Sequence, residues 1–198
     1  MNSATVEFLM RGFRLKDEPR VGWRLRHIRN PESVADHSWG TALLCMMFAA
    51  EAGVDEHEAL RIALVHDLAE AETGDIASRE RPEDRDVSID EKARLELAAM
   101  ESLLNGSHPR LREAWERYEN RATPAAVFVR DMNLIDMCLQ ALFYERERRY
   151  DPSSCAENVL DEFFRSAAAR LSTDTGRTLF AAVEAAYQTV RADHQTAS

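Results

Sequence analysis

Cysteine is scarce in this sequence, and Cys45, Cys138 and Cys155 form an odd set without the spacing of a metal knuckle. We therefore expect neither a disulfide framework nor a zinc knuckle, and free thiols are typical of a reducing, cytoplasmic environment. Glycine and proline are sparse as well, with 7 and 6 residues respectively. Their scarcity excludes collagen-like and linker-like regions, and residues 1–198 are expected to form a single domain.

Basic residues are also fewer than acidic ones. The chain has 25 Lys and Arg residues and 35 Asp and Glu residues, which gives a net charge of -10. A protein that binds a nucleic-acid polymer needs a surplus of basic side chains on at least one face. A small anionic substrate stays possible, since exposed charges are screened beyond about 10 Å. The longest apolar run, residues 41–50, is far shorter than the roughly 20 residues of a membrane span. We expect a cytoplasmic protein with no nucleic-acid polymer and no membrane as a partner.

Helical periodicity is the pattern that recurs along the chain. Apolar residues return every three to four positions, and no segment shows the sustained alternation of a strand. We therefore expect an all-α fold, a compact helical bundle. The expected helices cover residues 6–13, 33–52, 56–71, 89–104, 109–119, 124–149, 155–169 and 175–192, with an irregular segment at 20–32 and an exposed loop at 78–86.

The helix expected over residues 33–52 has clear end signals. Ser33 is a suitable N-cap and Gly53 a suitable stop. Trp39, Met46, Met47 and Phe48 are expected to be packing residues of the core rather than part of a site.

His66 and Asp67 follow an apolar stretch near the end of the helix expected over residues 56–71. Adjacent helical residues point about 100° apart, so both side chains are able to reach one ion beside the helix. Glu70 lies on the same side one turn later. Ionisable groups close to a core need an ion or a charged partner, because an unpaired buried charge is costly. A core histidine beside two surface acids is the alternative interpretation.

His37 lies early in the helix expected over residues 33–52, and 29 residues separate it from His66. This separation equals one helix, a short turn and part of a returning helix, so an antiparallel pair would bring the two histidines to a comparable height. Histidine and carboxylate ligands without thiolates suit Mn, Fe, Co, Ni or Zn. His37, His66 and Asp67 are therefore candidate ligands of one divalent transition metal ion.

Three segments then carry a resemblance to a known family. They are residues 32–37 (ESVADH), 63–70 (ALVHDLAE) and 73–75 (TGD). In this order they resemble the HD-domain phosphohydrolases, and they are most similar to the 5′-deoxynucleotidase branch. Matches such as Gly22 and Trp23 extend the resemblance over about residues 8–148, and helices within 155–192 are expected to complete the bundle.

The resemblance implies a function for the three candidate ligands. They would hold the ion of a metal-dependent phosphohydrolase that releases phosphate from deoxyribonucleoside 5′-monophosphates, a small-molecule substrate, and the enzyme would be a homodimer. A deoxynucleoside triphosphate triphosphohydrolase shares the same ligand pattern and stays open as an alternative. A second alternative is a catalytically weak HD domain that binds a nucleotide and regulates a partner.

The fourth ligand departs from the family pattern, since Asn133 stands where the family has an aspartate. In the first interpretation, Asn133 is a neutral ligand that binds the ion through its amide oxygen or through a bridging water. Alternatively, Asp136 lies three residues later on the same helix face and would replace it. Asp131 points about 200° away and is a poorer substitute. The third interpretation is a site with reduced metal affinity.

The resemblance also assigns roles to residues around the ion. Glu70 is the candidate for proton transfer, and Asp75 is a candidate catalytic acid or, alternatively, a helix N-cap. Among Arg20, Arg24, Arg26 and Arg29, we expect Arg26 first and Arg24 second to bind phosphate, as guanidinium groups do in bidentate fashion. Trp23 is expected beside the sugar, with a core anchor as the alternative.

Overall fold

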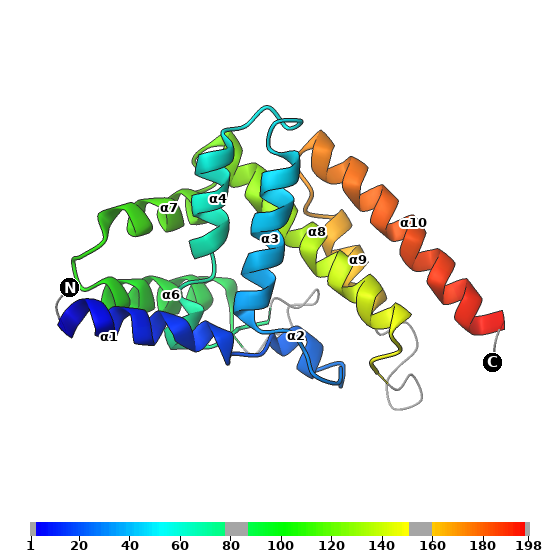
Figure 1. Cartoon of the computed structure of the whole chain (residues 1–198), viewed down its shortest axis with the longest axis horizontal. Coiled ribbons are helices and arrows are strands. Elements are labelled where there is room, and N and C mark those ends of the chain that lie inside the picture. The colour runs from blue at the N-terminus through cyan, green and yellow to red at the C-terminus, as the bar shows by residue number, and fades with distance from the viewer. Residues whose placement is uncertain (1–2, 78–86, 151–159, 197–198) are drawn as a thin grey trace.

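The chain folds into helices in the computed structural model, which describes residues 3–77, 87–150 and 160–196. No β-strand occurs within these three ranges, where one isolated bridge joins Pro19 and Ser33. The all-α prediction is therefore confirmed. The elements in Figure 1 are α1 (Ser3–Gly12), the 3₁₀ helix η1 (Phe13–Lys16), α2 (Val21–Arg24), α3 (Val34–Phe48), α4 (Glu56–Val65), α5 (Glu70–Thr73), α6 (Ile89–Leu104), α7 (Pro109–Asn120), α8 (Pro124–Arg146), α9 (Asp161–Ala168) and α10 (Asp174–Thr196).

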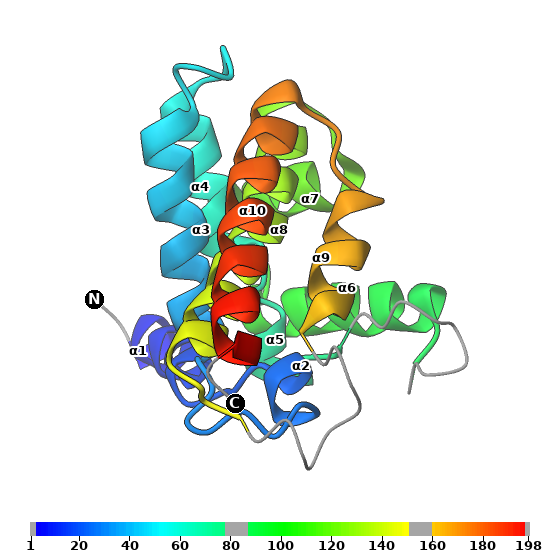
Figure 2. The ribbon, with the colours of Figure 1, turned by 90° about the vertical axis from the view of Figure 1, so that its right-hand side faces the viewer.

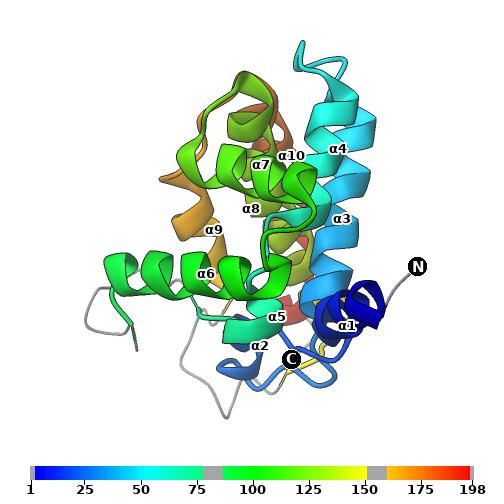
Figure 3. The ribbon, with the colours of Figure 1, turned by 90° about the vertical axis from the view of Figure 1, so that its left-hand side faces the viewer.

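Helix α8 runs through the middle of the bundle and organises the other helices. It packs against α3, α4, α9 and α10, and Figure 2 shows α3 and α4 to its left, α9 to its right and α10 in front of it. Helices α1 and α6 contact each other at one end of the bundle, and Figure 3 shows α1 beside one end of α6. Phe128, Met132 and Ile135 of α8 are fully buried, so the centre of the core lies along this helix.

Helix α3 begins where the sequence predicts and exposes more apolar surface than expected. Ser33 and Asp36 form a reciprocal capping box at its N-terminus. The prediction that Trp39, Met46 and Met47 pack in the core is wrong, because their exposed fractions are 67%, 54% and 60%. The helix is apolar on all sides, and α4 and α8 cover only part of its surface.

The helix predicted over residues 56–71 is interrupted at the metal motif. Helix α4 ends at Val65, and α5 begins only at Glu70. Between them the backbone bonds span three residues instead of four, with Leu68 N donating to Val65 O and Glu70 N to Asp67 O. Such tight turns at the end of a helix are common at functional sites, and this one presents His66 and Asp67.

Other segments also differ from the predictions. The segment predicted to be irregular, residues 20–32, contains the single helical turn α2. The predicted helix over residues 155–169 is described only from residue 160, with α9 beginning at Asp161. The loop predicted at residues 78–86 lies outside the described residues.

Asp131 joins α8 to the start of α10 instead of facing the metal motif. Its fully buried carboxylate accepts hydrogen bonds from Ser172 N, from Thr173 N at 2.7 Å and from Thr173 Oγ1 at 2.6 Å. Thr173 Oγ1 in turn accepts from Gly176 N. Asp131 therefore fixes the first turn of α10, which agrees with its rejection as a metal ligand.

Truncation of Asp131 is expected to destabilise the protein without changing its metal site. Asp131→Ala would leave the buried donors of residues 172 and 173 without partners, at a cost of about 2–4 kcal/mol. Urea unfolding of the metal-free protein measures this loss. Asp174→Ala is the matched control, because the side chain of Asp174 is 99% exposed. Equal stability of the two variants would contradict the role given to Asp131.

Within the described ranges, no helix is both long enough and apolar enough to cross a lipid bilayer.

Candidate metal centre and active site

His37, His66 and Asp67 converge at one point between α3 and the turn after α4. The Nε2 atoms of the two histidines are 3.3 Å apart. Asp67 Oδ2 lies 3.2 Å from His66 Nε2 and 3.6 Å from His37 Nε2. The three candidate ligand atoms thus lie within 4.8 Å of one another, as the antiparallel arrangement of two helices predicts.

The outer nitrogen of each ring is held by an acceptor. His37 Nδ1 lies 2.6 Å from Asp136 Oδ2, and His66 Nδ1 lies 2.7 Å from the carbonyl oxygen of Ala63. A carbonyl accepts and never donates, so the hydrogen-bond network assigns a proton to Nδ1 of His66, and the same assignment suits His37. Both Nε2 atoms are therefore directed at the common point, which is the usual preparation of metal-binding histidines.

The charges around this point fit a cation. Burial lowers the pKa of His37 to about 3, so its ring is neutral. Burial also opposes charge on His66, but the adjacent Asp67 carboxylate outweighs it and raises the pKa of His66. The Asp67 carboxylate thus favours positive charge at the point where it meets the two imidazole nitrogens. These three donor atoms suit a divalent transition metal ion.

Arg20 lies at the centre of the acidic residues beside this point. Its Nη1 atom is 3.3 Å from Asp67 Oδ2, 3.5 Å from Asp75 Oδ1 and 3.9 Å from Glu70 Oε2. Burial alone would lower the pKa of Arg20, but Asp75, Asp67 and Glu70 raise it above its ordinary value. The guanidinium group is therefore a fixed positive charge next to the candidate ligands.

Glu70 is buried beside the candidate ligands and incompletely paired. Its Oε2 atom has no hydrogen-bond partner in the described structure, and its Oε1 atom lies 3.8 Å from Lys92 Nζ. Burial, reinforced by the negative charge of Asp67, raises the pKa of Glu70 well above its ordinary value. A carboxyl group with these properties is suited to holding and transferring a proton.

Asp75 lies between the start of α2 and the side chain of Arg20. One oxygen accepts a hydrogen bond from Val21 N, at the start of α2, and the other faces Arg20. It therefore caps the short helix that precedes it in the chain, and it fixes Arg20 beside Glu70 and Asp67.

The fourth ligand position is shaped by an asparagine and a tyrosine. Asn133 Nδ2 donates to the Tyr118 hydroxyl at 2.7 Å, and the Tyr118 ring packs edge-on against His66 with centroids 5.1 Å apart. Because the amide nitrogen of Asn133 makes this hydrogen bond, the amide oxygen takes no part in it. Asp136, the alternative ligand, instead contacts His37 on the nitrogen that faces away from His66.

A cavity of about 620 Å³ opens onto this centre, a volume suited to a small ligand. Asp67, Glu70 and Asn133 line it, together with residues of α6, α7 and α9. Arg26, which is expected from the sequence to bind phosphate, lines the cavity and forms an ion pair with Glu162.

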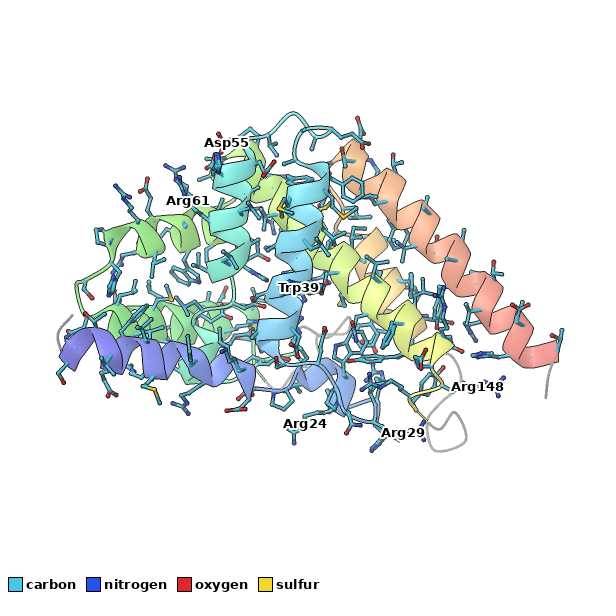
Figure 4. All side chains as sticks on the ribbon, viewed as in Figure 1. Arg24, Arg29, Trp39, Asp55, Arg61 and Arg148 are labelled. Carbon is cyan, nitrogen blue, oxygen red and sulfur yellow. The ribbon has the colours of Figure 1, made fainter. Side chains whose placement is uncertain are left out.

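The two other predicted substrate residues have different surroundings. Arg24 is exposed on the outer side of α2, as Figure 4 shows, and is not among the described residues that line the cavity. Trp23 also lines the cavity but is only 2% exposed. Its Nε1 atom donates to Glu32 Oε1 at 2.7 Å, and its ring packs against Phe163. The structure therefore supports a core anchor at one edge of the cavity.

Three residues of the centre were not singled out from the sequence: Arg20, Lys92 and Tyr118. Arg20 was one of four arginines in a segment without periodicity, so no local signal separated it from Arg26. Lys92 is one turn before Glu96 on the predicted helix over residues 89–104, a spacing typical of surface ion pairs. Tyr118 follows the buried Ala114 and Trp115 at helical spacing on α7, so periodicity alone indicates a core residue.

Comparisons with known proteins agree with this geometry. A family model of the HD domain matches residues 13–173. The protein named 5'-deoxynucleotidase HDDC2 of Xenopus laevis is 36% identical over 83% of this chain and 78% of its own length. The 5'-deoxynucleotidase hdd1 of Schizosaccharomyces pombe is 37% identical over 72% of this chain and 73% of its own. The crystal structure of the PH0347 protein of Pyrococcus horikoshii has a TM-score of 0.71 and 28% identity, covering 92% of this chain and 98% of that one. The chain belongs to the HD domain family.

Proposed function

We propose that this protein is a metal-dependent 5′-nucleotidase that releases phosphate from deoxyribonucleoside 5′-monophosphates. The observation that carries the proposal is the convergence of His37, His66 and Asp67 within 4.8 Å, at a cavity that Glu70 and Arg20 also line. Two imidazoles and a carboxylate are ligands that Mn, Co, Fe, Ni and Zn accept. A small nucleotide, rather than a polymer, suits the net charge of -10.

The relatives support the choice of substrate. Two proteins named 5'-deoxynucleotidase are 36% and 37% identical to this chain. A cyanophage HD phosphohydrolase, solved with dA and one catalytic Zn²⁺ ion, shares the fold with a TM-score of 0.55 at 21% identity. Zinc is therefore one candidate among the divalent ions.

The ligand set has four members in this proposal. His37 and His66 would hold the ion through Nε2, Asp67 through Oδ2, and Asn133 through its amide oxygen. When bound, such an ion polarises a phosphoryl oxygen and supplies a water of lowered pKa. The Nδ1 hydrogen bonds of both histidines already fix their rings in the required direction.

The charged residues beside the ion would bind the phosphate, transfer the proton and hold the side chains in place. Arg20 would bind the phosphate, because its guanidinium group is fixed next to Asp67 and is always charged. Glu70 would take a proton from the attacking water, since its Oε2 atom has no other hydrogen-bond partner in the described residues. Asp75 would hold Arg20 in place. Arg26 and Trp23 would form the wall of the cavity further from the ion.

One assay tests the proposed reaction. The purified protein is loaded with Mn, Co or Zn, its metal content is measured, and product release is followed from deoxyribonucleotides and ribonucleotides. We expect inorganic phosphate from deoxyribonucleoside monophosphates. Triphosphate released from deoxynucleoside triphosphates would instead establish a triphosphohydrolase. Nucleotide binding without product release would establish a regulatory HD domain, and absence of both metal and activity would overturn the enzyme proposal.

Restoring the carboxylate at position 133 is expected to strengthen metal binding. In Asn133→Asp, a charged ligand replaces a neutral one, and the dissociation constant of the ion should fall roughly tenfold or more, which corresponds to about 1.4 kcal/mol. Asn133→Ala should raise the constant by a similar factor, since it removes the amide oxygen. Competition with a chelator measures both. Unchanged affinity in Asn133→Ala would show that residue 133 is not a ligand.

We also propose that the protein is a cytoplasmic homodimer. Trp39, Leu43 and Met46 recur at helical spacing on one exposed side of α3, and Figure 4 shows Trp39 at the surface. Leu139 and Phe143 are exposed on α8, against which α3 packs. Exposed apolar side chains on neighbouring helices are typical of a subunit interface when they form one patch. Buried, unpaired thiols at Cys45 and Cys138 agree with a reducing location.

Met46→Glu is expected to convert the proposed dimer into a monomer. Burying an unpaired carboxylate in an apolar interface is costly, whereas the free surface accommodates it. Sedimentation velocity measures the change in mass. Met10→Glu, on α1, is the matched control because Met10 is 63% exposed and lies on another helix. A wild-type protein that sediments as a monomer at micromolar concentration would contradict the homodimer.

A further inference from the structure

Gly40 leaves a gap on α3 that the carboxylate of Asp136 fills. A Cβ atom built on Gly40 would lie 1.9 Å from Asp136 Oδ1 and 2.9 Å from Asp136 Cγ. Real side chains do not approach so closely, so any larger residue at position 40 would displace this carboxylate. The aspartate belongs to α8, which packs directly on α3.

The displaced group is the one that holds His37. Asp136 Oδ2 lies 2.6 Å from His37 Nδ1, and His37 itself is fully buried. Gly40 lies three residues after His37, one helical turn along the same face of α3. The gap and the ring are thus neighbours on one helix, and the carboxylate that fills the gap also contacts the ring.

We propose that Gly40 and Asp136 form a positioning pair that orients His37 for metal binding. The proposal rests on the metal ligation proposed above and goes beyond it, because neither residue touches the ion. A carboxylate on Nδ1 fixes the tautomer and the plane of a metal-binding imidazole, and here it keeps Nε2 directed at His66 Nε2, 3.3 Å away. Asp136 is accordingly a positioning residue and not the replacement for the fourth ligand.

Glycine at this position opposes the ordinary preference of a helix. Alanine favours helix formation over glycine in the interior of a helix such as α3. By propensity alone, Gly40→Ala would strengthen α3. The steric overlap instead predicts that Gly40→Ala lowers the free energy of unfolding. Once the Asp136 carboxylate is removed, the same substitution should raise it.

A second glycine supplies a matched control within the same chain. A Cβ atom on Gly176 of α10 would lie 2.4 Å from Asp131 Oδ2. This pair also joins a helical glycine to an aspartate of α8, but Asp131 binds the backbone of residues 172 and 173 rather than a histidine. Gly176→Ala therefore creates a similar steric overlap with an aspartate but does not affect the contact with His37.

Two quantities are measured for each variant of the full chain. The dissociation constant of Co²⁺ is measured by visible absorption or by chelator competition, and the free energy of unfolding is measured in urea. Gly40→Ala and Asp136→Ala should each weaken Co²⁺ binding roughly 10–100-fold, as loss of such outer partners does. Gly176→Ala should lower stability and leave Co²⁺ affinity unchanged. In Gly40→Ala/Asp136→Ala, affinity should be no worse than in Asp136→Ala, and stability should exceed that of Asp136→Ala.

Each result separates this proposal from the metal site itself. A wild-type protein that binds no Co²⁺ would overturn the ligation on which the pair rests. Wild-type Co²⁺ affinity in Gly40→Ala or in Asp136→Ala would overturn the pair alone, as would losses that add in the double variant. If Gly40→Ala does not fold, Asp136→Ala and the double variant still decide, since a foldable double variant establishes the overlap.

Discussion

Replacement of Asp67 by asparagine is expected to abolish metal binding and activity. With Asn133 as the fourth ligand, Asp67 is the one carboxylate in the proposed set, and Asp67→Asn would leave only neutral ligands. Arg20 Nη1 lies 3.3 Å from Asp67 Oδ2, so its positive charge would then oppose the ion without compensation. Loss of one partner of a buried charge pair costs about 3–5 kcal/mol, which predicts a dissociation constant at least ~100-fold higher.

Metal content after gel filtration and chelator competition measure the effect of Asp67→Asn. Glu96→Gln is the matched control, because Glu96 lines the same cavity from α6 but is not among the candidate ligands. Retention of the ion at wild-type affinity in Asp67→Asn would show that the ligand set proposed here is wrong. Activity measured at saturating metal then tells a binding defect from a catalytic one.

Glu70→Gln is expected to lower kcat by roughly 10²–10⁴ while the ion stays bound. The amide keeps the volume of the side chain but cannot accept the proton of the attacking water. Because Glu70 must be ionised to accept this proton, wild-type activity should rise with pH through its pKa, and Glu70→Gln should lack this rise. Single-turnover kinetics over a range of pH, with metal content measured alongside, separate the two effects.

The stability of the metal-free protein gives an independent check on Glu70. Burial raises its pKa well above 4.5, the ordinary value. The stabilising effect of its proton is therefore complete below that value and is lost as pH rises through the folded pKa. Relative to the wild type, Glu70→Gln should gain free energy of unfolding as the pH rises from 4.5 through the folded pKa of Glu70. A constant difference over this range would mean that Glu70 is not buried as a protonated acid.

The positive charge at the centre shows how tertiary contacts select among similar residues. The sequence offers Arg20, Arg24 and Arg26 within one short segment, and the family resemblance favours Arg26. In the structure Arg20 faces Asp67 and Asp75, whereas Arg26 pairs with Glu162 of α9 and Arg24 is exposed. Glu162 is distant in sequence, so no local pattern predicts its contact with Arg26.

Local patterns determined the elements of this protein and the ligand types. Three-to-four-residue apolar spacing is a property of each helix alone, and it predicted α6 with its observed ends, Ile89–Leu104. The capping residues around Ser33 act within one turn, so they were also readable from the chain. The spacing of His37, His66 and Asp67 required only that two successive helices pack antiparallel. The prediction of a single domain over residues 1–198 stays a prediction.

Only the tertiary structure decided what lies around these ligands. The tight turn after Val65 and the contact of Asp136 with His37 depend on how α3, α4 and α8 pack. The gap at Gly40 is defined by a carboxylate 96 positions further along the chain, and helical periodicity does not report such contacts. The sequence by itself determined which side chains are available for metal chemistry. Packing between helices decided which of them are buried, charged and aimed at one point, because burial and electrostatic coupling arise only when distant segments meet.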